Sequence, residues 1–306
     1  MRTERNGWRL LVALAVMALA LFAAACGDDD EDDGDSSDSP DVEVEEFPAD
    51  TTMGEIQEAG EINLGVKYDV PPFGFNNPTS GEVEGFDVDL GKYIAARLGV
   101  EPVFREANSD NRIPLLVDGT IDLILSTMTI TQERDLEIDY SEPYYVANGD
   151  VLVPEGSDIA SLEDLAGNTV CTAIGSTYQS TIKEEVPDAD LRLVDGYSEC
   201  LELIQTDAVD AVSTDNVILT GMVIQDDTLQ LLDLDYTEEP YGVGIPDGDT
   251  EMKEFVDESV AQFIEDGTWQ ETYDEWVGQY LPEDQQQGPP EITLEEALEL
   301  FPLPKD

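Results

Sequence analysis

Residues 119–134 read GTIDLILSTMTITQER, and this stretch says most about the fold. Positions 121–125 form a short, mostly apolar run, bounded by Gly119 on one side and by hydroxyl side chains on the other. A short apolar run between such boundaries is typical of a buried strand in a parallel sheet. The sequence therefore predicts a buried strand here, with Thr127, Thr129 and Arg134 just beyond its carboxyl end.

Strands and helices alternate along the chain on both sides of this run. Residues 61–66 predict a first strand, apolar positions recur at helical spacing over residues 90–98, and Gly99 is placed to cap that helix. The pattern restarts after Tyr145, and a late strand is expected over residues 241–245. Alternation of this kind predicts the α/β class, here with a second α/β lobe.

The amino-terminal residues have the order of an export signal. Three arginines by position 9 precede an apolar run over residues 10–25, which is shorter than the roughly 20 residues that span a bilayer core. Residues 21–26, LFAAAC, resemble a bacterial lipoprotein cleavage box, although Ala23 stands where the usual box has Leu. We predict a lipoprotein signal peptide over residues 1–25, lipid attachment at Cys26, and anchoring to the outer face of the cytoplasmic membrane. A plain signal peptide or a short membrane anchor is the alternative.

Three further segments follow the predicted signal. Residues 26–50 are rich in Asp, Ser, Glu and Pro, which predicts a disordered acidic tether. Residues 51–281 are too many for one small core and suit two lobes. Residues 282–306 form an acidic tail with one amphipathic stretch over residues 294–301, to which the sequence assigns no role.

The charge of the chain is extreme. The net charge is −58, and the first 25 residues contribute +2 to it, so the remainder carries −60. Nucleic acid is excluded as a partner. A chain poor in Lys and without His resembles proteins of organisms that live in concentrated salt, where a Debye length of roughly 3 Å at 1 M screens self-repulsion. We expect a halophilic or halotolerant source.

Two cysteines remain if Cys26 carries lipid. Cys171 and Cys200 would then lie in an oxidising compartment, where they can pair. A disulfide closing a loop of about thirty residues would stabilise the fold by about 3 kcal/mol in the chain-entropy model. Two unpaired buried thiols are the alternative.

Several strings resemble the amino-acid solute-binding proteins of bacterial ABC importers, family 3, of the periplasmic-binding-protein type II. They are GFDVDL at 85–90, DLILSTMTITQER at 122–134, DYSEPYY at 139–145, VDAVSTD at 209–215 and GTW at 267–269. Within the family, the Val170-Cys171 pair and the YSEC string at 197–200 are most similar to actinobacterial glutamate-binding lipoproteins, which supports the disulfide.

The resemblance implies a two-lobed fold of the Venus-flytrap type that closes on its ligand. Lobe one would comprise residues 51–147 plus 240–281, and lobe two residues 148–239. Two crossover strands, near Asn148 and near Glu239, would join the lobes.

The resemblance also implies which residues meet the α-groups of an amino acid. Arg134 would grip the α-carboxylate with its planar fork, unless it pairs on the surface with Glu133 or Asp135. Thr127 and Thr129 would offer a carbonyl to the ammonium and a hydroxyl to the carboxylate, unless they are ordinary strand-end threonines.

Lobe two would supply the remaining contacts with the α-groups. Asp215 would accept the α-ammonium, although Asp also favours the N-cap of a helix that starts near Asn216. Thr177 ends a Gly175-Ser176 loop between a strand and a helix, where free backbone N–H groups favour an anion.

Lys67 and Arg112 correspond to positions that face the ligand side chain. Two cations there favour an acidic ligand, glutamate or aspartate; a solvated lysine and a helix-surface ion pair are the alternatives. Glutamine or another polar amino acid is the next choice of ligand.

The implied function is solute binding for an ABC permease, by a monomer, with no cofactor, metal or covalent chemistry. A carboxylate-based dehydratase on the same fold and a sensory module are the rivals. A chain without His, and without an expected free Cys, excludes nucleophilic triads and imidazole catalysis, and we expect no enzyme activity.

Overall fold

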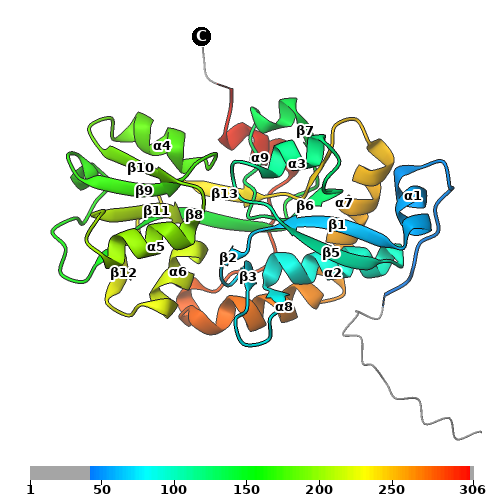
Figure 1. Cartoon of the computed structure of the whole chain (residues 1–306), viewed down its shortest axis with the longest axis horizontal. Helices are drawn as coiled ribbons and strands as arrows, with labels where there is room; N and C mark the ends of the chain where they lie inside the picture. Colours follow the sequence, from blue (N-terminus) through cyan, green and yellow to red (C-terminus); the bar gives the residue numbers. More distant parts are fainter. Residues whose placement is uncertain (1–41, 304–306) are drawn as a thin grey trace, which may run out of the picture. The chain divides into compact units, whose positions relative to one another are not determined.

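A computed structural model describes residues 42–303, which form two α/β lobes, each built on its own sheet (Figure 1). The predicted signal peptide, the lipid site Cys26 and tether residues 26–41 lie outside the described residues, as do residues 304–306. Among the described helices, none combines the length and the apolar character that crossing a membrane requires.

The sheet of lobe one has the order β5-β1-β6-β14-β7. Its strands are β1 (Glu61–Val66), β5 (Glu101–Glu106), β6 (Leu123–Ile124), β7 (Ile138–Tyr140) and β14 (Gly244–Pro246). β1 runs parallel to both β5 and β6, whereas β14 runs antiparallel to β6 and β7. The predicted strand at 121–125 is confirmed as the central strand β6, shorter than expected and fully buried.

Helices and a small hairpin sheet complete lobe one. The elements are α1 (Thr52–Ala59), β2 (Asp69–Val70), β3 (Gly74–Asn76), β4 (Val83–Glu84), α2 (Phe86–Leu98), α3 (Arg112–Val117), η1 (Arg134–Leu136), α7 (Thr250–Glu265), α8 (Thr268–Trp276), η3 (Gly278–Tyr280), η4 (Glu283–Gln285) and α9 (Leu294–Leu300). The cap predicted at Gly99 is confirmed: its φ is 71°, and its N–H bonds the carbonyls of Ala95 and Ala96.

The second sheet, in lobe two, has the order β10-β9-β11-β8-β12. Its strands are β8 (Tyr145–Pro154), β9 (Thr169–Ala173), β10 (Asp190–Val194), β11 (Ala211–Asp215) and β12 (Leu229–Leu231); its helices are η2 (Glu163–Leu165), α4 (Tyr178–Glu185), α5 (Tyr197–Gln205) and α6 (Asn216–Gln225). β9 is parallel to β10 and β11, which gives the second α/β lobe that the sequence predicts.

Two strands connect the lobes. β8 leads from lobe one into the second sheet, and β13 (Glu238–Tyr241) pairs antiparallel with β8 on the way back, with Glu238 opposite Asn148 (Figure 1). The single strand expected over residues 241–245 is wrong, because the chain leaves the β13 ladder at Tyr241 and joins lobe one at Gly244. Between the two strands, the Gly242 N–H donates to the Met128 carbonyl, beside an isolated antiparallel bridge between Thr129 and Tyr241.

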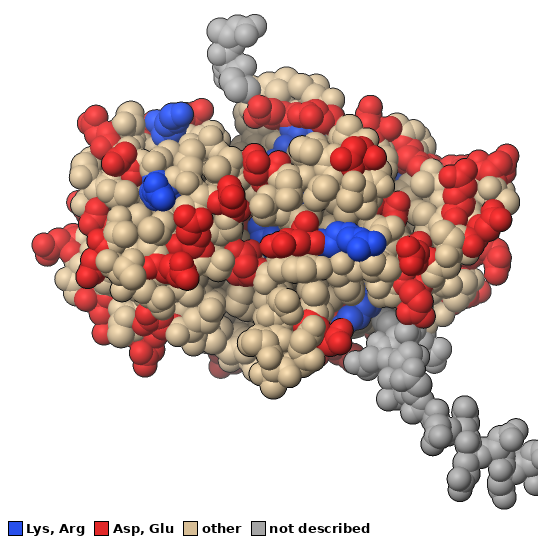
Figure 2. Space-filling view, in the orientation of Figure 1, with Lys and Arg blue, Asp and Glu red and all other residues tan. Residues whose placement is uncertain are grey.

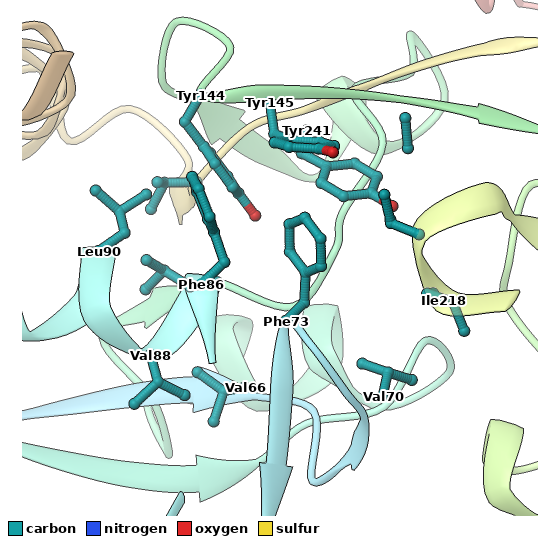
Figure 3. Packing of buried hydrophobic residues seen from close by; sticks show 14 of the residues in the cluster. Val66, Val70, Phe73, Phe86, Val88, Leu90, Tyr144, Tyr145, Ile218 and Tyr241 are labelled. Atoms are coloured by element: carbon teal, nitrogen blue, oxygen red, sulfur yellow. The ribbon is translucent and has the colours of Figure 1, made fainter. Parts of the chain in front are cut away.

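An aromatic core packs around the start of β8 and the end of β13. Phe73 lies edge-on to Tyr145 with ring centroids 4.8 Å apart, and Tyr145 stacks on Tyr241 at 5.7 Å (Figure 3). Ile218 of α6 belongs to the same buried cluster. Because such rings bury large apolar areas, the cluster fixes the crossover strands against both lobes.

The tether prediction is wrong for residues 42–50, which pack on lobe one. Phe47 meets Phe255 of α7 edge-to-face at 5.3 Å, and the Glu45 N–H donates to the carbonyl of Arg97. The apolar residues Val42 and Phe47 interrupt the acidic composition and contact the core, which is enough to order this end of the segment.

The tail also packs on the body. Ala297 of α9 is fully buried in a cluster that includes Ile113 and Leu115, and Gln287 donates to the carbonyl of Val146 in β8. A capping box at Thr293 and Glu296 starts α9. The tail therefore follows lobe one from the crossover strands to α3.

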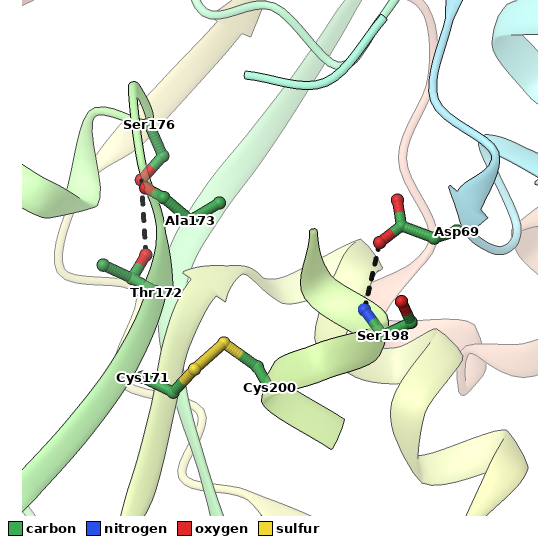
Figure 4. The surroundings of a disulfide bond; sticks show 7 residues. All are labelled: Asp69, Cys171, Thr172, Ala173, Ser176, Ser198 and Cys200. Atoms are coloured by element: carbon green, nitrogen blue, oxygen red, sulfur yellow. Dashed lines mark hydrogen bonds between the residues drawn. A yellow bond between two sulfur atoms is a disulfide. The ribbon is translucent and has the colours of Figure 1, made fainter. Parts of the chain in front are cut away.

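The predicted disulfide is present in lobe two. Cys171 of β9 and Cys200 of α5 are bonded, at a sequence separation of 29 residues (Figure 4). Acidic side chains are scattered over the whole face drawn in Figure 2, with fewer basic ones among them. The surface thus carries the negative charge that the composition predicts.

Candidate functional site

Two cations of lobe one converge on a single backbone carbonyl. The Lys67 ammonium, just after β1, donates to the Ser126 carbonyl oxygen at 2.7 Å, and Arg112, at the start of α3, donates to the same oxygen at 2.6 Å. Lys67 is 3% exposed and Arg112 is 2% exposed. Neither is the solvated lysine or surface ion pair that the sequence left open.

The turn after β6 holds these carbonyls in place. Thr127 has φ 42°, a conformation that a β-branched residue rarely adopts, so this turn is strained in the way that functional sites often are. The Thr127 N–H donates to the buried Asp87 carboxylate at 2.8 Å, and the Tyr144 hydroxyl donates to its other oxygen. Burial raises the pKa of Asp87 to about 6, although these two hydrogen bonds act to lower it.

Arg134, the first residue of η1, reaches from lobe one to lobe two. Its Nη1 donates to the Thr129 carbonyl at 2.6 Å, and its Nη2 donates to the Gly175 carbonyl at 3.0 Å. Within residues 42–303 it forms no ion pair with Glu133 or Asp135. The surface alternative for Arg134 is therefore not what the structure shows.

The lobes approach each other closely on both sides of this contact. A Cβ atom at Gly175, where φ is 75°, would lie 2.7 Å from the Ser109 carbonyl of lobe one, so this approach requires glycine. At another point the Ser198 N–H donates to Asp69 across the lobes at 3.0 Å (Figure 4). The described body thus has its two lobes in contact around the candidate site.

Asp215 ends β11 and is buried on the lobe-two side. It occupies the N-cap position of α6, but its side chain makes no capping hydrogen bond and accepts instead from the Tyr178 hydroxyl at 3.0 Å. Burial raises the pKa of Asp215, whereas Lys67 is the strongest influence that lowers it. Lys67 of lobe one and Asp215 of lobe two are therefore electrostatic partners.

Burial and neighbouring positive charges lower the pKa values of both buried cations, Lys67 and Arg112. Burial lowers the pKa of Lys67 well below its ordinary value, and Arg112 lowers it further. Burial, and then Arg134, lower the pKa of Arg112 to about 9, and the buried Arg112 Nε has no hydrogen-bond partner among the described residues. An added anion near these groups would stabilise their charged forms.

The sequence prediction missed Glu239. This residue of β13 is fully buried, and it accepts hydrogen bonds from two predicted site residues, Thr129 and Thr177. Burial, and then Asp215, raise the pKa of Glu239 to about 7. The adjacent Glu238 and Glu239 look alike in the sequence, and only the register of β13 shows which one turns inward.

Seven predicted site residues thus gather where the lobes meet. Six of them are nine-tenths or more buried with hydrogen bonds inside the site, among them Thr127 of the strained turn, and Arg134 is half-buried; the set is Lys67, Arg112, Thr127, Thr129, Arg134, Thr177 and Asp215. The arrangement places three cations and one carboxylate around a shared interface, which suits recognition of a small zwitterion.

The chain is similar to known solute-binding proteins. The family model described as bacterial extracellular solute-binding proteins, family 3, matches residues 62–279. The ABC transporter glutamine-binding protein GlnH of Bacillus subtilis is 36% identical, over 87% of this chain and 96% of that protein. The glutamate-binding protein GluB of Corynebacterium efficiens is 31% identical, over 72% of this chain and 80% of that protein.

A solved structure gives the same result for the fold. An ancestral arginine-binding protein bound to glutamine superposes with a TM-score of 0.69 at 35% identity, covering 72% of this chain and 98% of that one. The family match covers most of both lobes, so the sequence similarity and the two-lobed fold indicate the same family. The chain belongs to the bacterial extracellular solute-binding proteins, family 3.

Proposed function

We propose that this chain is the ligand-binding component of an ABC importer for an acidic amino acid, glutamate or aspartate. The observation that carries the proposal is the buried pair Lys67 and Arg112, both directed at the Ser126 carbonyl. The carboxylates of Asp215 and Asp87 act on Lys67 at a distance, but among the described residues neither cation donates a hydrogen bond to a carboxylate, and a second carboxylate on the ligand would supply one.

The electrostatics favour an anion beside this pair. Burial lowers the pKa of both cations, with Arg112 lowering that of Lys67 further and Arg134 that of Arg112, and the buried Arg112 Nε has no acceptor among the described residues. A glutamine side chain would offer one carbonyl oxygen but no charge. A carboxylate would offer two oxygens and a full charge, so it compensates both cations better.

The α-groups of the ligand are recognised from opposite lobes. Arg134 of lobe one binds the α-carboxylate, and Asp215 of lobe two accepts from the α-ammonium, with the hydroxyl oxygens of Thr129 and Thr177 as further acceptors for it. Thr127 supplies the strained turn that orients the neighbouring carbonyls. A ligand that touches both lobes stabilises the closed form, which is the form that the permease recognises.

Glutamine is the second candidate ligand. It is favoured by the name of the Bacillus subtilis relative, which is more similar to this chain than the glutamate-binding relative from Corynebacterium efficiens is. These relatives are named as binding proteins rather than enzymes, and we propose no reaction for this chain.

The cellular setting follows from the amino-terminal sequence. We place residues 1–25 as a signal peptide and Cys26 as the lipid-bearing residue that holds a monomer at the outer face of the cytoplasmic membrane. In cells, a Cys26→Ala variant should leave the membrane fraction and no longer incorporate labelled fatty acid. Retention of label in that variant would refute attachment at this residue.

Variants that remove the charge of each cation test the ligand class. Lys67→Met and Arg112→Gln should each weaken glutamate binding by about tenfold or more, because each removes a buried charged partner. Glutamine binding should change less or improve. If the affinities for glutamate and glutamine fall equally in both variants, Lys67 and Arg112 do not recognise the ligand side chain.

A further inference from the structure

Glu239 joins three parts of the molecule through one carboxylate. Its Oε2 accepts from the Thr129 hydroxyl at 2.6 Å and from the Thr177 hydroxyl at 3.1 Å, while its Oε1 accepts from the Thr237 hydroxyl at 2.9 Å. Thr129 belongs to lobe one, Thr177 stands at the start of α4 in lobe two, and Thr237 directly precedes β13. A single oxygen atom therefore receives donors from both lobes.

We propose that Glu239 is a positioning residue, which orients the Thr129 and Thr177 hydroxyls at the ligand site and holds the two lobes together once they close. The proposal rests on the proposed function only in that an amino acid binds between the lobes. It does not depend on which amino acid binds.

Hydrogen-bond capacity explains the orientation. A threonine hydroxyl has one hydrogen, and in both Thr129 and Thr177 that hydrogen is directed at Glu239. The oxygen lone pairs of both hydroxyls are then left for a donor. Without the Glu239 acceptor, each hydroxyl would rotate freely and would have to be oriented by the ligand itself, at a cost to binding.

The position of Glu239 explains how it would stabilise the closed arrangement of the lobes. The residue is 0% exposed, so its carboxylate depends on these three donors to replace water. Opening the lobes would carry Thr129 and Thr177 apart, and the shared oxygen would lose at least one donor. β13 is one of the two crossover strands, so Glu239 lies where the lobes rotate against each other.

The neighbouring residue provides a matched control. Glu238 stands next to Glu239 in β13, opposite Asn148, but its side chain is exposed. Glu238→Gln and Glu239→Gln remove the same charge from the same strand with the same change of atoms. Any difference in binding or stability between the two variants therefore arises because the Glu239 side chain is buried and the Glu238 side chain is exposed.

Stopped-flow binding to the purified chain tests the proposal, with glutamate, aspartate, glutamine and arginine as probes. In Glu239→Gln the dissociation rate should rise about tenfold for every probe that binds, since one charged acceptor of two hydroxyls is lost, while the association rate stays unchanged. Glu238→Gln should match the parent in both rates. The ratio of affinities between probes, which tests the proposed ligand class, should not move.

Thermal unfolding without ligand separates this role from a purely structural one. A structural role predicts a lower midpoint for Glu239→Gln with an unchanged dissociation rate, and that result would overturn the proposal. If Glu239→Gln does not fold, Thr237→Val removes the donor that fixes Oε1 without touching the ligand site. Its dissociation rate should rise by roughly threefold, and parental rates in a folded Thr237→Val would contradict the proposal.

Discussion

Arg134 of lobe one donates from Nη2 to the carbonyl oxygen of Gly175 in lobe two, at 3.0 Å. The same guanidinium bonds the Thr129 carbonyl through Nη1, so one side chain links the carboxyl-end turn of lobe one to the β9–α4 loop of lobe two. A cation at this junction can serve an anionic group of a ligand and the closed arrangement of the lobes together.

Removal of Arg134 should abolish most of the binding. Arg134→Ala is expected to weaken amino-acid affinity by well over tenfold, because a charged contact in a desolvated site contributes several kcal/mol when one partner is removed. Isothermal titration measures the loss. Arg192→Ala, at an exposed position of β10, is the control and should bind like the parent; equal affinities of the two variants would remove Arg134 from the site.

Folding stability should depend on pH through Glu239. Its folded pKa of about 7 is raised above the ordinary value of 4.5, so the folded state holds this proton more tightly than the unfolded state does. The associated stability is fully present below pH 4.5 and is lost as the pH rises through 7. Asp87, with a pKa raised to about 6, contributes in the same direction.

Paired glutamine variants isolate the Glu239 contribution from that of the acidic surface. Urea unfolding at pH 5 and at pH 8 should show a smaller pH dependence for Glu239→Gln than for the parent. The exposed Glu238→Gln should keep the parental dependence. Identical slopes in the two variants would mean that the Glu239 pKa is not raised.

The disulfide should contribute to stability but not to ligand recognition. Replacing both Cys171 and Cys200 by Ser should lower the free energy of unfolding by about 3 kcal/mol, because the bond closes a loop of about thirty residues. A reducing agent should lower the parental stability toward the same value and leave the double variant unchanged. Ligand affinity of the folded variant should stay within about twofold of the parent; a larger loss would assign the bond a role in the site.

Salt should stabilise the folded chain strongly. With a net charge of −58, the folded surface repels itself at low ionic strength, and the Debye length shortens from about 10 Å at 0.1 M to about 3 Å at 1 M. Thermal unfolding in increasing KCl should show a rising midpoint and partial unfolding after dialysis to low salt. Sucrose at equal osmolality is the control; a midpoint indifferent to KCl would contradict a halophilic adaptation.

The lobes could be predicted from local alternation of strands and helices, and the disulfide from the number of cysteines and the family resemblance. The apolar run of β6 and the Gly99 cap each encode one element without reference to distant contacts, whereas the roles expected for Arg134 and Asp215 came from the family resemblance. The approximate crossover positions followed from the family resemblance, and Asn148 does pair with Glu238.

The remaining features depend on tertiary contacts that no local pattern contains. In the sequence, Phe47 is a single aromatic residue in an acidic segment. Its packing partner, Phe255 of α7, is known only from the structure. Residues 242 and 243, between β13 and β14, hydrogen-bond to Met128 and Ser141, which are distant in the sequence. Glu239 is set apart from Glu238 only by the pairing of β13 with β8, so its burial could not be read from the sequence.

Isothermal titration of the purified chain at high salt, with glutamate, aspartate, glutamine and arginine in turn, tests the central claim most directly. The account predicts saturable one-to-one binding of glutamate or aspartate that is tighter than that of glutamine, with no binding of arginine, because Lys67 and Arg112 would repel its side chain. Glutamine bound more tightly than both acidic ligands, or measurable binding of arginine, would contradict it.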